Sequence, residues 1–305
     1  MRILVTGASG LLGLNFCLWA AQHHEVIGIV HSHTLSHVPF KLRRADLSNE
    51  KLARNIIAEE QPNLVVHCAA MANLDQCERM PEAAKIINAD LPSWLAEECA
   101  VRNVQFLHIS TDSVFDGYKK GAYTEADIPN PLCVYARTKF EGEKAVQENN
   151  PKALIVRVNF YGLSLSGKRS LAEFFLYNLL AGKHVKGFTD VHFCPLYVKD
   201  LSVILIKMIS KELKGLYHVV SSESLSKYDF GVRLARYFNL DTSLIIPTSV
   251  NKSGLIAHRS SNLVLCIDKL KNALGEMIPA QEQGLHHFYN SYKEGYATRL
   301  KKYLV

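Results

Sequence analysis

The stretch Val5-Thr6-Gly7-Ala8-Ser9-Gly10-Leu11-Leu12-Gly13 decides how this chain begins to fold. It follows the apolar run Ile3-Leu4-Val5, which predicts a buried strand, and it leads into an apolar pattern typical of a helix. Three glycines at such a junction permit a sharp turn, a close approach of a ligand to the backbone, and tight packing of helix on strand. Unpaired N–H groups at a helix start attract phosphate. We therefore predict a dinucleotide cradle with contacts from Gly7, Ser9, Gly10, Leu11 and Leu12.

The glycine spacing here is G-x-x-G-x-x-G, whereas the familiar dinucleotide fingerprint is G-x-G-x-x-G. A strand-helix connection without a ligand is the alternative interpretation. The segment Tyr135-Ala136-Arg137-Thr138-Lys139, far downstream, favours the cofactor. Residues four apart on a predicted helix share a face, and an ammonium beside a phenol favours the phenolate and lowers its pKa. Tyr135 then becomes a usable acid or base, and Lys139 can also hold the nicotinamide ribose.

Short apolar runs alternate with helical patterns in the first half of the chain, which is typical of parallel βαβ units. We predict an α/β fold: a Rossmann-type doubly wound parallel sheet with a smaller α/β substrate-binding lobe. Residues 1–160 form the NAD(P)-binding domain, with a return segment near 188–210, and residues 161–305 form mainly the substrate lobe. The predicted strands are Arg2–Thr6, Glu25–Val30, Lys41–Arg44, Leu64–His67, Gln105–Ser110 and Ala153–Val158. The predicted helices are Leu11–His23, Asn49–Glu60, Glu82–Arg102, Tyr135–Asn149, Ser170–Ala181, Asp200–Lys211 and Lys227–Asn239.

Composition narrows the possible classes of protein. The 305 residues are 48% hydrophobic and carry a formal net charge of +6, with charges interspersed rather than grouped. That net charge suits an anionic small substrate, or serves solubility alone. The sequence shows no basic stripe of the kind that nucleic-acid binding needs, so we expect no nucleic-acid partner. Seven scattered cysteines without C-x-x-C spacing indicate reduced thiols in a cytoplasmic protein. No signal peptide, membrane span or metal-ligand spacing is recognised, so we expect no metal and no membrane partner.

The second strand bears on the choice of cofactor. Enzymes that prefer NAD place an acidic residue at its end, on the ribose 2′-hydroxyl, but no acidic residue occurs between Glu25 and Asp46. The intervening cations and hydroxyl are His31, Ser32, His33, Lys41, Arg43 and Arg44. A 2′-phosphate would meet attraction there, which favours NADPH and leaves NADH possible; cations that merely face solvent are the alternative. The remaining expected cofactor contacts are His31, Asp46, Leu47, Ala69 and Ala70, besides Tyr135 and Lys139.

Several motifs together resemble the extended short-chain dehydrogenase/reductase family and, within it, the dTDP-4-dehydrorhamnose reductases. They are Thr6 to Gly13, Ser110-Thr111-Asp112-Ser113-Val114-Phe115-Asp116-Gly117, Tyr123-x-Glu125, Pro131 and Tyr135-x-x-x-Lys139-x-x-Gly142-Glu143. Looser echoes are Pro195-x-x-x-Lys199-Asp200-Leu201, Gly215-x-Tyr217-His218 and Arg259-Ser260-Ser261-Asn262. The resemblance implies the catalytic residues Thr111, Tyr135 and Lys139, with NADPH reducing the C4 ketone of a nucleotide-linked 4-keto-6-deoxy sugar. It further implies substrate contacts from Thr111, Asp112, Asn159 and Arg259, and a homodimer.

Departures from the reductase pattern fall near the expected sugar. Ser113 stands where those enzymes usually have tyrosine, Ser260 follows Arg259 in place of proline, and Leu196 follows Pro195 in place of threonine. The reaction type is therefore better supported than the sugar.

Three alternatives can be compared on the same residues. A sugar-nucleotide 4,6-dehydratase commonly needs Asp-Glu after the threonine, and Asp112-Ser113 lacks the glutamate. A 4-epimerase that keeps NAD bound would use the same three catalytic residues. A non-catalytic NADP-binding regulatory subunit would not need these three residues intact. The regulatory subunit of methionine adenosyltransferase is similar in fold.

Overall fold

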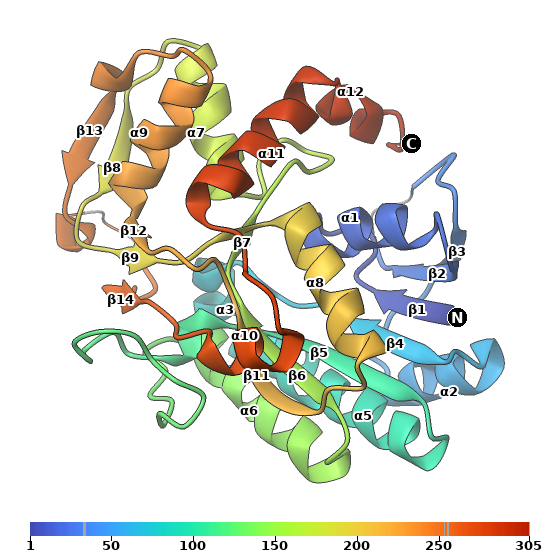
Figure 1. The fold of residues 1–305 in the computed structure, drawn as a ribbon. Coiled ribbons are helices and arrows are strands. Elements are labelled where there is room, and N and C mark those ends of the chain that lie inside the picture. Colours follow the sequence, from blue (N-terminus) through green and yellow to red (C-terminus); the bar gives the residue numbers. More distant parts are fainter. Residues whose placement is uncertain (33–34, 253, 255, 305) are drawn as a thin grey trace.

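The computed structural model describes residues 1–32, 35–252, 254 and 256–304. Within these residues the largest sheet has seven strands, all parallel, in the order β11-β6-β5-β4-β1-β2-β3 (Figure 1). The strand order reverses beside β1, which is the place where doubly wound sheets bind ligands. The strands are β1 (Arg2–Thr6), β2 (Glu25–Val30), β3 (Lys41–Arg44), β4 (Leu64–His67), β5 (Gln105–Thr111), β6 (Leu154–Val158) and β11 (Gly215–Val219).

Alternate residues of the buried strands pack on opposite faces of this sheet. Ile3 and Val5 pack with the buried sides of α1 (Leu11–Ala20) and α8 (Val198–Ser210). Leu4 belongs to a second core cluster with residues of α2 (Glu50–Glu60), α5 (Leu91–Val101) and α6 (Val134–Asn149). The prediction of a doubly wound α/β fold is confirmed.

The helix predicted over 82–102 forms in three consecutive pieces. They are α4 (Pro81–Lys85), a π-helical turn (Ile86–Asp90) and α5, and they follow the unpredicted α3 (Leu74–Arg79). The π turn places Asn88 so that its side chain accepts a hydrogen bond from the Met71 N–H at 2.9 Å and donates one to the Met71 carbonyl at 3.1 Å. This side chain fixes the loop that follows β4, and that loop is part of the region where the cofactor is expected.

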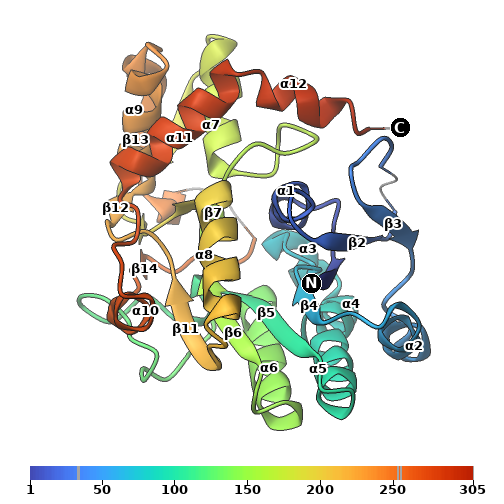
Figure 2. The same ribbon diagram turned by 45° about the vertical axis from the view of Figure 1, so that its right-hand side comes forward.

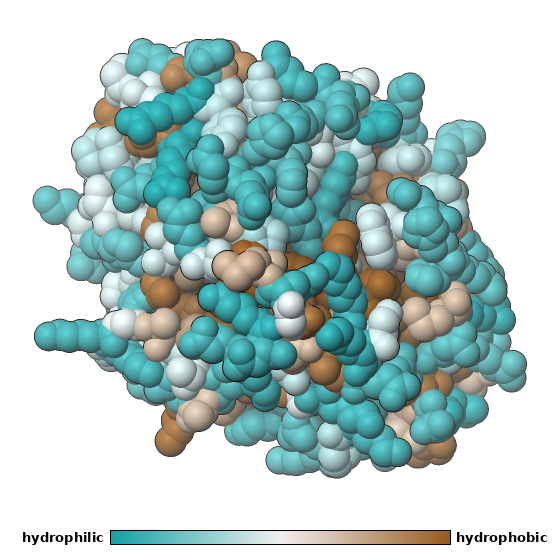
Figure 3. Space-filling model, viewed as in Figure 1, coloured by the Kyte–Doolittle hydropathy of each residue, from teal (hydrophilic) through white to brown (hydrophobic). Residues whose placement is uncertain are grey.

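The second half of the chain builds a smaller lobe of short strands and helices, which Figures 1 and 2 show above the large sheet. Its strands pair as β7 (Phe160–Tyr161) with β10 (Leu196–Tyr197), as β8 (Val185–Phe188) with β13 (Ile245–Thr248), and as β9 (His192–Phe193) with β12 (Leu225–Ser226) and β14 (Asn262–Leu263). Its helices include α7 (Leu171–Leu180), α9 (Lys227–Tyr237), α11 (Gln281–Lys293) and α12 (Tyr296–Lys301), whereas α10 (Asp268–Leu274) lies beside β11 of the large sheet. The chain returns to the large sheet at α8 and β11. The face in Figure 3 is mostly hydrophilic, with apolar residues gathered across its middle.

Two adjacent residues fix the position of α6. Gly142 lies so close to the π turn that an added Cβ would be 2.2 Å from the Asn88 carbonyl oxygen. Glu143, which is buried, receives hydrogen bonds from Arg157 of β6 at 2.7 Å and from the Ser110 hydroxyl of β5 at 2.5 Å. Helix α6 is therefore held between a close backbone contact and a buried ion pair.

We expect Gly142→Ala to destabilise the protein although alanine is the better helix former. The added methyl must displace backbone, at a cost of about 1–3 kcal/mol or more, whereas the gain in helix propensity is only about 1 kcal/mol. Urea unfolding would measure the free energy of unfolding, with the exposed Gln147→Ala of the same helix as control. Equal stability of the Gly142→Ala variant and the wild type would contradict the close contact.

Candidate functional site

The three glycines of the cradle each meet a separate steric demand. Gly7 has φ +69°, and a Cβ there would lie 2.8 Å from the Cα of Ala69. A Cβ on Gly13 would lie 2.2 Å from the carbonyl oxygen of Gly7, and Gly10 donates its N–H to that same oxygen at 2.9 Å. The turn is thus as tight as the sequence indicates. It places Ala69, which follows β4, directly against the cradle.

The first turn of α1 is suited to an anion. Gly10 caps the helix without a side chain, and the first turn holds no acidic residue. The first backbone hydrogen bond of the helix comes from Leu14 N–H to the Gly10 carbonyl at 3.0 Å. The N–H groups of Leu11 and Leu12 precede it, at the positive end of the helix dipole. These donors and the glycine turn fit the pyrophosphate of a dinucleotide.

Of the cations that the sequence offers to a 2′-phosphate, two are engaged elsewhere. The Lys41 ammonium lies 2.7 Å from Glu60, and Arg43 forms ion pairs with Glu59 and Glu60. Both side chains are therefore turned to α2. His33 lies outside the described residues.

His31, Arg44 and Asp46 lie together where β2 and β3 end. Arg44 donates from Nε to the His31 carbonyl at 3.1 Å, and His31 Nε2 lies 3.8 Å from the Asp46 carboxylate. Hydrogen bonds from Ser48 are the main cause of the lowered pKa of Asp46. The Leu47 side chain is buried in the core, while Ala70 is exposed beside the cradle. Arg44 is exposed, and its hydrogen bond to the His31 carbonyl holds it at this end of the sheet.

Thr111 and Tyr135 meet at the carboxyl edge of the sheet. Thr111 ends β5 and caps the 3₁₀ turn that follows (Asp112–Val114). Its hydroxyl accepts a hydrogen bond from the Ser113 N–H at 3.2 Å. Tyr135 is the second residue of α6. Burial raises the pKa of Tyr135, and a hydrogen bond with Thr111 lowers it by less. The net shift is thus opposite to the one expected from an ammonium nearby.

Lys139 lies one helical turn after Tyr135 and is almost completely buried. Its Nζ donates to the Ile109 carbonyl at 2.7 Å and lies 3.4 Å from His108 Nε2. Burial lowers the pKa of Lys139 to about 8, and the negative charge of Glu143 opposes this shift. Its charge state therefore changes close to neutral pH.

Asp112 is buried beside the expected sugar position. It accepts a hydrogen bond from Asn159 at 2.5 Å and others from the hydroxyls of Thr111 and Ser113. Burial raises the pKa of Asp112, whereas these hydrogen bonds and the charge of Lys227 lower it. Asp112 and Asn159, both predicted substrate contacts, thus lie next to Thr111.

Lys227 at the start of α9 was not foreseen. Burial lowers its pKa, as does the charge of Arg259, while Asp112 raises it. Its Nζ also lies 5.9 Å from the ring centre of Phe188. No motif distinguishes this lysine in the sequence, because only the fold brings α9 to the end of β5.

Arg259 lies near this group but already has a partner. It donates to the Asp75 carboxylate of α3 at 3.2 Å and to the carbonyl of Ala257 at 3.3 Å. Ala257 and Tyr135 pack in the same small cluster. The predicted role of Arg259 toward a diphosphate therefore requires that the guanidinium serve both Asp75 and the ligand.

Other motif residues hold the loop after β5. Tyr123 donates its hydroxyl proton to Asp116 at 2.8 Å and accepts the Gly117 N–H at 3.0 Å. Gly117 has φ +83°, and a Cβ there would be 2.8 Å from the backbone nitrogens of Ser261 and Asn262. These motif residues therefore have a structural role. They join the loop after β5 to the segment that contains Arg259.

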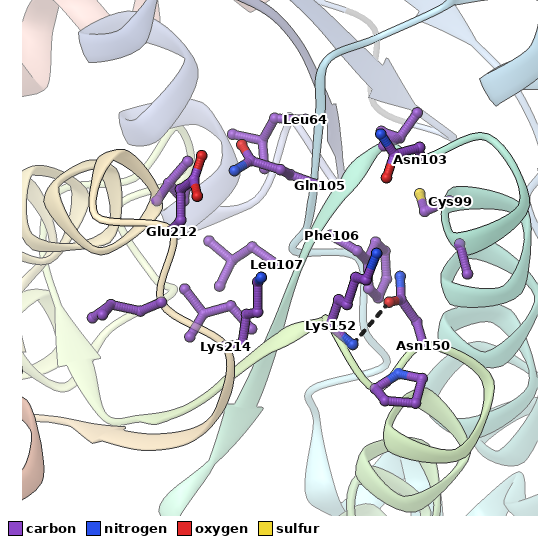
Figure 4. A pocket seen from close by; sticks show the side chains of 16 residues that line it. Leu64, Cys99, Asn103, Gln105, Phe106, Leu107, Asn150, Lys152, Glu212 and Lys214 are labelled. Carbon is purple, nitrogen blue, oxygen red and sulfur yellow. Dashed lines mark hydrogen bonds between the residues drawn. The ribbon is translucent and has the colours of Figure 1, made fainter.

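The cavity in Figure 4 lies at the opposite edge of the sheet. Its volume is about 440 Å³, and its lining includes the amino ends of β4, β5 and β6, at Leu64, Gln105 and Leu154. Lys152, which lines it, donates its backbone N–H to Asn150 at 3.2 Å. No cradle residue borders this cavity, so it is separate from the candidate active site.

The residues that the structure describes contain no group of three or more His, Cys, Asp or Glu side chains arranged to bind a metal ion. Nor does any helix among them have the length and apolar character needed to cross a bilayer.

Curated relatives match most of the chain. The "probable low-salt glycan biosynthesis reductase Agl14" of Haloferax volcanii is 32% identical over 289 residues, covering 93% of this chain and 96% of the relative. Methionine adenosyltransferase 2 subunit beta of Bos taurus is 31% identical, covering 91% and 84%.

Solved structures share the fold. A dTDP-4-dehydrorhamnose reductase of Clostridium acetobutylicum superposes with a TM-score of 0.86 at 28% identity, covering 96% of this chain and all of that one. The dTDP-4-dehydrorhamnose reductase of Bacillus anthracis, solved in complex with NADP, has a TM-score of 0.83 at 26% identity and coverages of 95% and 99%. The family model described as RmlD substrate binding domain matches residues 1–294, and this chain belongs to that family.

Proposed function

We propose that this protein is an NADPH-dependent reductase that acts on the C4 ketone of a nucleotide-linked 4-keto-6-deoxy sugar. The observation that carries the proposal is the grouping of Thr111, Tyr135 and Lys139 at the carboxyl edge of β5, with the glycine cradle at the same edge of the sheet. Relatives named as dTDP-4-dehydrorhamnose reductases support the reaction type.

Cofactor binding would use two groups of residues. Gly7, Ser9, Gly10, Leu11 and Leu12 would hold the pyrophosphate, and His31, Arg44, Asp46, Leu47, Ala69 and Ala70 would border the adenosine and the nicotinamide side. When bound, NADPH supplies the hydride. NADH would lack the phosphate that Arg44 is placed to meet, so we propose NADPH as the preferred cofactor.

Tyr135 would donate the proton that the reduced oxygen requires. Because burial raises its pKa, the phenol stays protonated at neutral pH, which suits a proton donor in the reductive direction. The Thr111 hydroxyl would orient the ketone oxygen. The Lys139 ammonium would stabilise the phenolate after proton transfer and return a proton to it.

The sugar would lie over Asp112 and Asn159. Both are polar, partly or fully buried and joined by a hydrogen bond, so they present a fixed pair of donors and acceptors. Lys227 and Arg259 would supply positive charge for the diphosphate. Ser113 follows Asp112 where a dehydratase commonly has glutamate, which favours reduction over dehydration.

A non-catalytic subunit is the second candidate. It is favoured by the 31% identity to methionine adenosyltransferase 2 subunit beta over 91% of this chain. An epimerase remains the alternative within catalysis, and NAD that copurifies and does not exchange would favour it.

A cytoplasmic homodimer completes the proposal. All seven cysteines are free, as expected of a reducing compartment. The helices α5 and α6 expose residues such as Glu97, Arg137 and Lys144, which would make a polar contact surface. Sedimentation equilibrium would give the mass in solution, and a monomer at micromolar concentration would contradict the dimer.

We expect Tyr135→Phe to lower kcat by about 10²–10⁴-fold, the usual contribution of a positioned proton donor, while NADPH still binds. NADPH oxidation would be followed against a panel of nucleotide-linked 4-keto sugars, with the exposed Tyr118→Phe as a matched control. Failure of the wild type to turn over any sugar would favour the non-catalytic subunit. Equal rates for Tyr135→Phe and the wild type would exclude Tyr135 as donor.

The rate should also depend on pH through Lys139. Because the pKa of Lys139 is lowered to about 8, the ammonium is present below that pH and is lost as the pH rises through it. We expect kcat to fall on the alkaline side with a midpoint near pH 8. A profile of kcat from pH 6 to 10 would measure the midpoint, and a constant rate up to pH 10 would contradict this assignment.

Replacing Arg44 should weaken NADPH and spare NADH. Loss of a charge-assisted hydrogen bond to the 2′-phosphate costs about 1.5–3 kcal/mol, so we expect Arg44→Ala to raise the Kd for NADPH at least tenfold. Titration of cofactor fluorescence would give both constants. Arg43→Ala is the matched control, because Arg43 is paired with α2. Equal losses for both cofactors would show that Arg44 does not select NADPH.

A further inference from the structure

A pair of buried histidines lies behind the catalytic lysine. His67 of β4 and His108 of β5 are directly opposite in the parallel register, and their rings stack with centroids 5.4 Å apart at 17°. Both side chains are essentially inaccessible to solvent. Phe106, two residues before His108, stacks on the same pair at 6.2 and 6.5 Å. The histidines therefore form part of the core beneath the site.

Hydrogen bonds connect this pair to both halves of the proposed active site. His108 Nε2 lies 3.4 Å from the Lys139 ammonium, and His67 Nδ1 lies 2.8 Å from the Thr6 hydroxyl. That hydroxyl also accepts the N–H of Ala69 at 3.2 Å. A row of side chains thus runs from Thr6, which immediately precedes the cradle, through both imidazoles to Lys139.

The contact with Lys139 defines the tautomer of His108. His108 accepts from the ammonium at Nε2, so its proton is on Nδ1. The Nδ1 of His108 and the Nε2 of His67 have no partner within the described part of the chain. An unpaired buried donor is costly, so a core that served packing alone would gain from an apolar side chain at either position.

The charged and titratable neighbours favour neutral imidazoles. Burial is the largest cause of the lowered pKa of His108, followed by the positive charge of Lys139 on α6 and by His67. Burial and Lys139 likewise lower the pKa of His67. Glu143 on α6 and Cys68 after β4 act on Lys139 with the opposite sign. Both histidines consequently remain acceptors at the pH where Lys139 titrates.

We propose that His108, backed by His67, is a positioning residue that holds Lys139 in its ammonium form. Lysine has three donors: the Ile109 carbonyl takes one and His108 takes a second, which leaves one for the catalytic side. This inference rests on the proposed function, since it assigns His108 a role through Lys139.

The test replaces His108 with phenylalanine, which keeps the ring stack and removes the acceptor, and with glutamine, which restores one. In protein carrying ¹³Cε-labelled lysine, the pH titration of Lys139 is followed by NMR, and Lys139→Met identifies its resonance. We expect the midpoint to fall by about one pH unit in His108→Phe and to return toward pH 8 in His108→Gln. The kcat of His108→Phe should then fall about threefold at pH 7.5 and stay within about a tenth of the wild-type value at pH 6, where the ammonium is nearly complete in both.

Phe106→Leu is the matched control, because Phe106 is buried in the same stack and its side chain has no nitrogen or oxygen to accept a hydrogen bond from Lys139. It should lower stability without moving the midpoint. An unchanged Lys139 titration in His108→Phe, or an equal loss of kcat at both pH values, would overturn the proposal. If His108→Phe does not fold, His108→Leu provides the same comparison. The NMR titration needs no substrate, so absent turnover counts only against the proposed function.

Discussion

The buried ion pair between Glu143 and Arg157 is the interaction on which the arrangement of the site depends. It joins α6 to β6, and the Ser110 hydroxyl extends it to β5. Arg157 also stacks on Phe115 at 4.9 Å, so the loop after β5 rests on the same guanidinium. Removing one partner of such a pair leaves an uncompensated buried charge at a cost of about 3–5 kcal/mol. The orientation of Tyr135 and Lys139 is thus set by Glu143, which lies on the same face of their helix, one turn beyond Lys139.

The motif around Tyr135 therefore has two parts with separate physical roles. Tyr135 and Lys139 face the carboxyl edge of the sheet, whereas Gly142 and Glu143 fix the height and rotation of α6 through Asn88 and Arg157. The second part holds α6 in place whether or not the first part catalyses a reaction. Presence of Gly142-Glu143 alone consequently says little about activity, and the combination with Thr111 is the more informative signal.

The first half of the fold could be predicted from the sequence because each buried strand there is a short apolar run bounded by turn residues. The strands Arg2–Thr6 and Leu64–His67 form with the predicted bounds. The smaller lobe was harder to predict, because β7, β9 and β10 are only two residues long and show no hydrophobic periodicity. At the site, the sequence motifs group Thr111 with Tyr135, and the two side chains form a hydrogen bond. The pairing of Lys41 and Arg43 with α2 and the approach of Lys227 to Asp112 depend on tertiary contacts that no local pattern encodes.

The strand β11 has a consequence for the synthesis of the protein. It covers the outer edge of β6, yet it comes from Gly215–Val219, long after β6 ends at Val158. At about 5–20 residues per second on a ribosome, the hydrogen-bonding edge of β6 stays bare for several seconds after that strand is complete. A bare edge is a template for pairing with another chain. During this interval the edge of β6 in a nascent chain is open to a chaperone, or to another nascent chain on the same polysome, before its own β11 can pair with it.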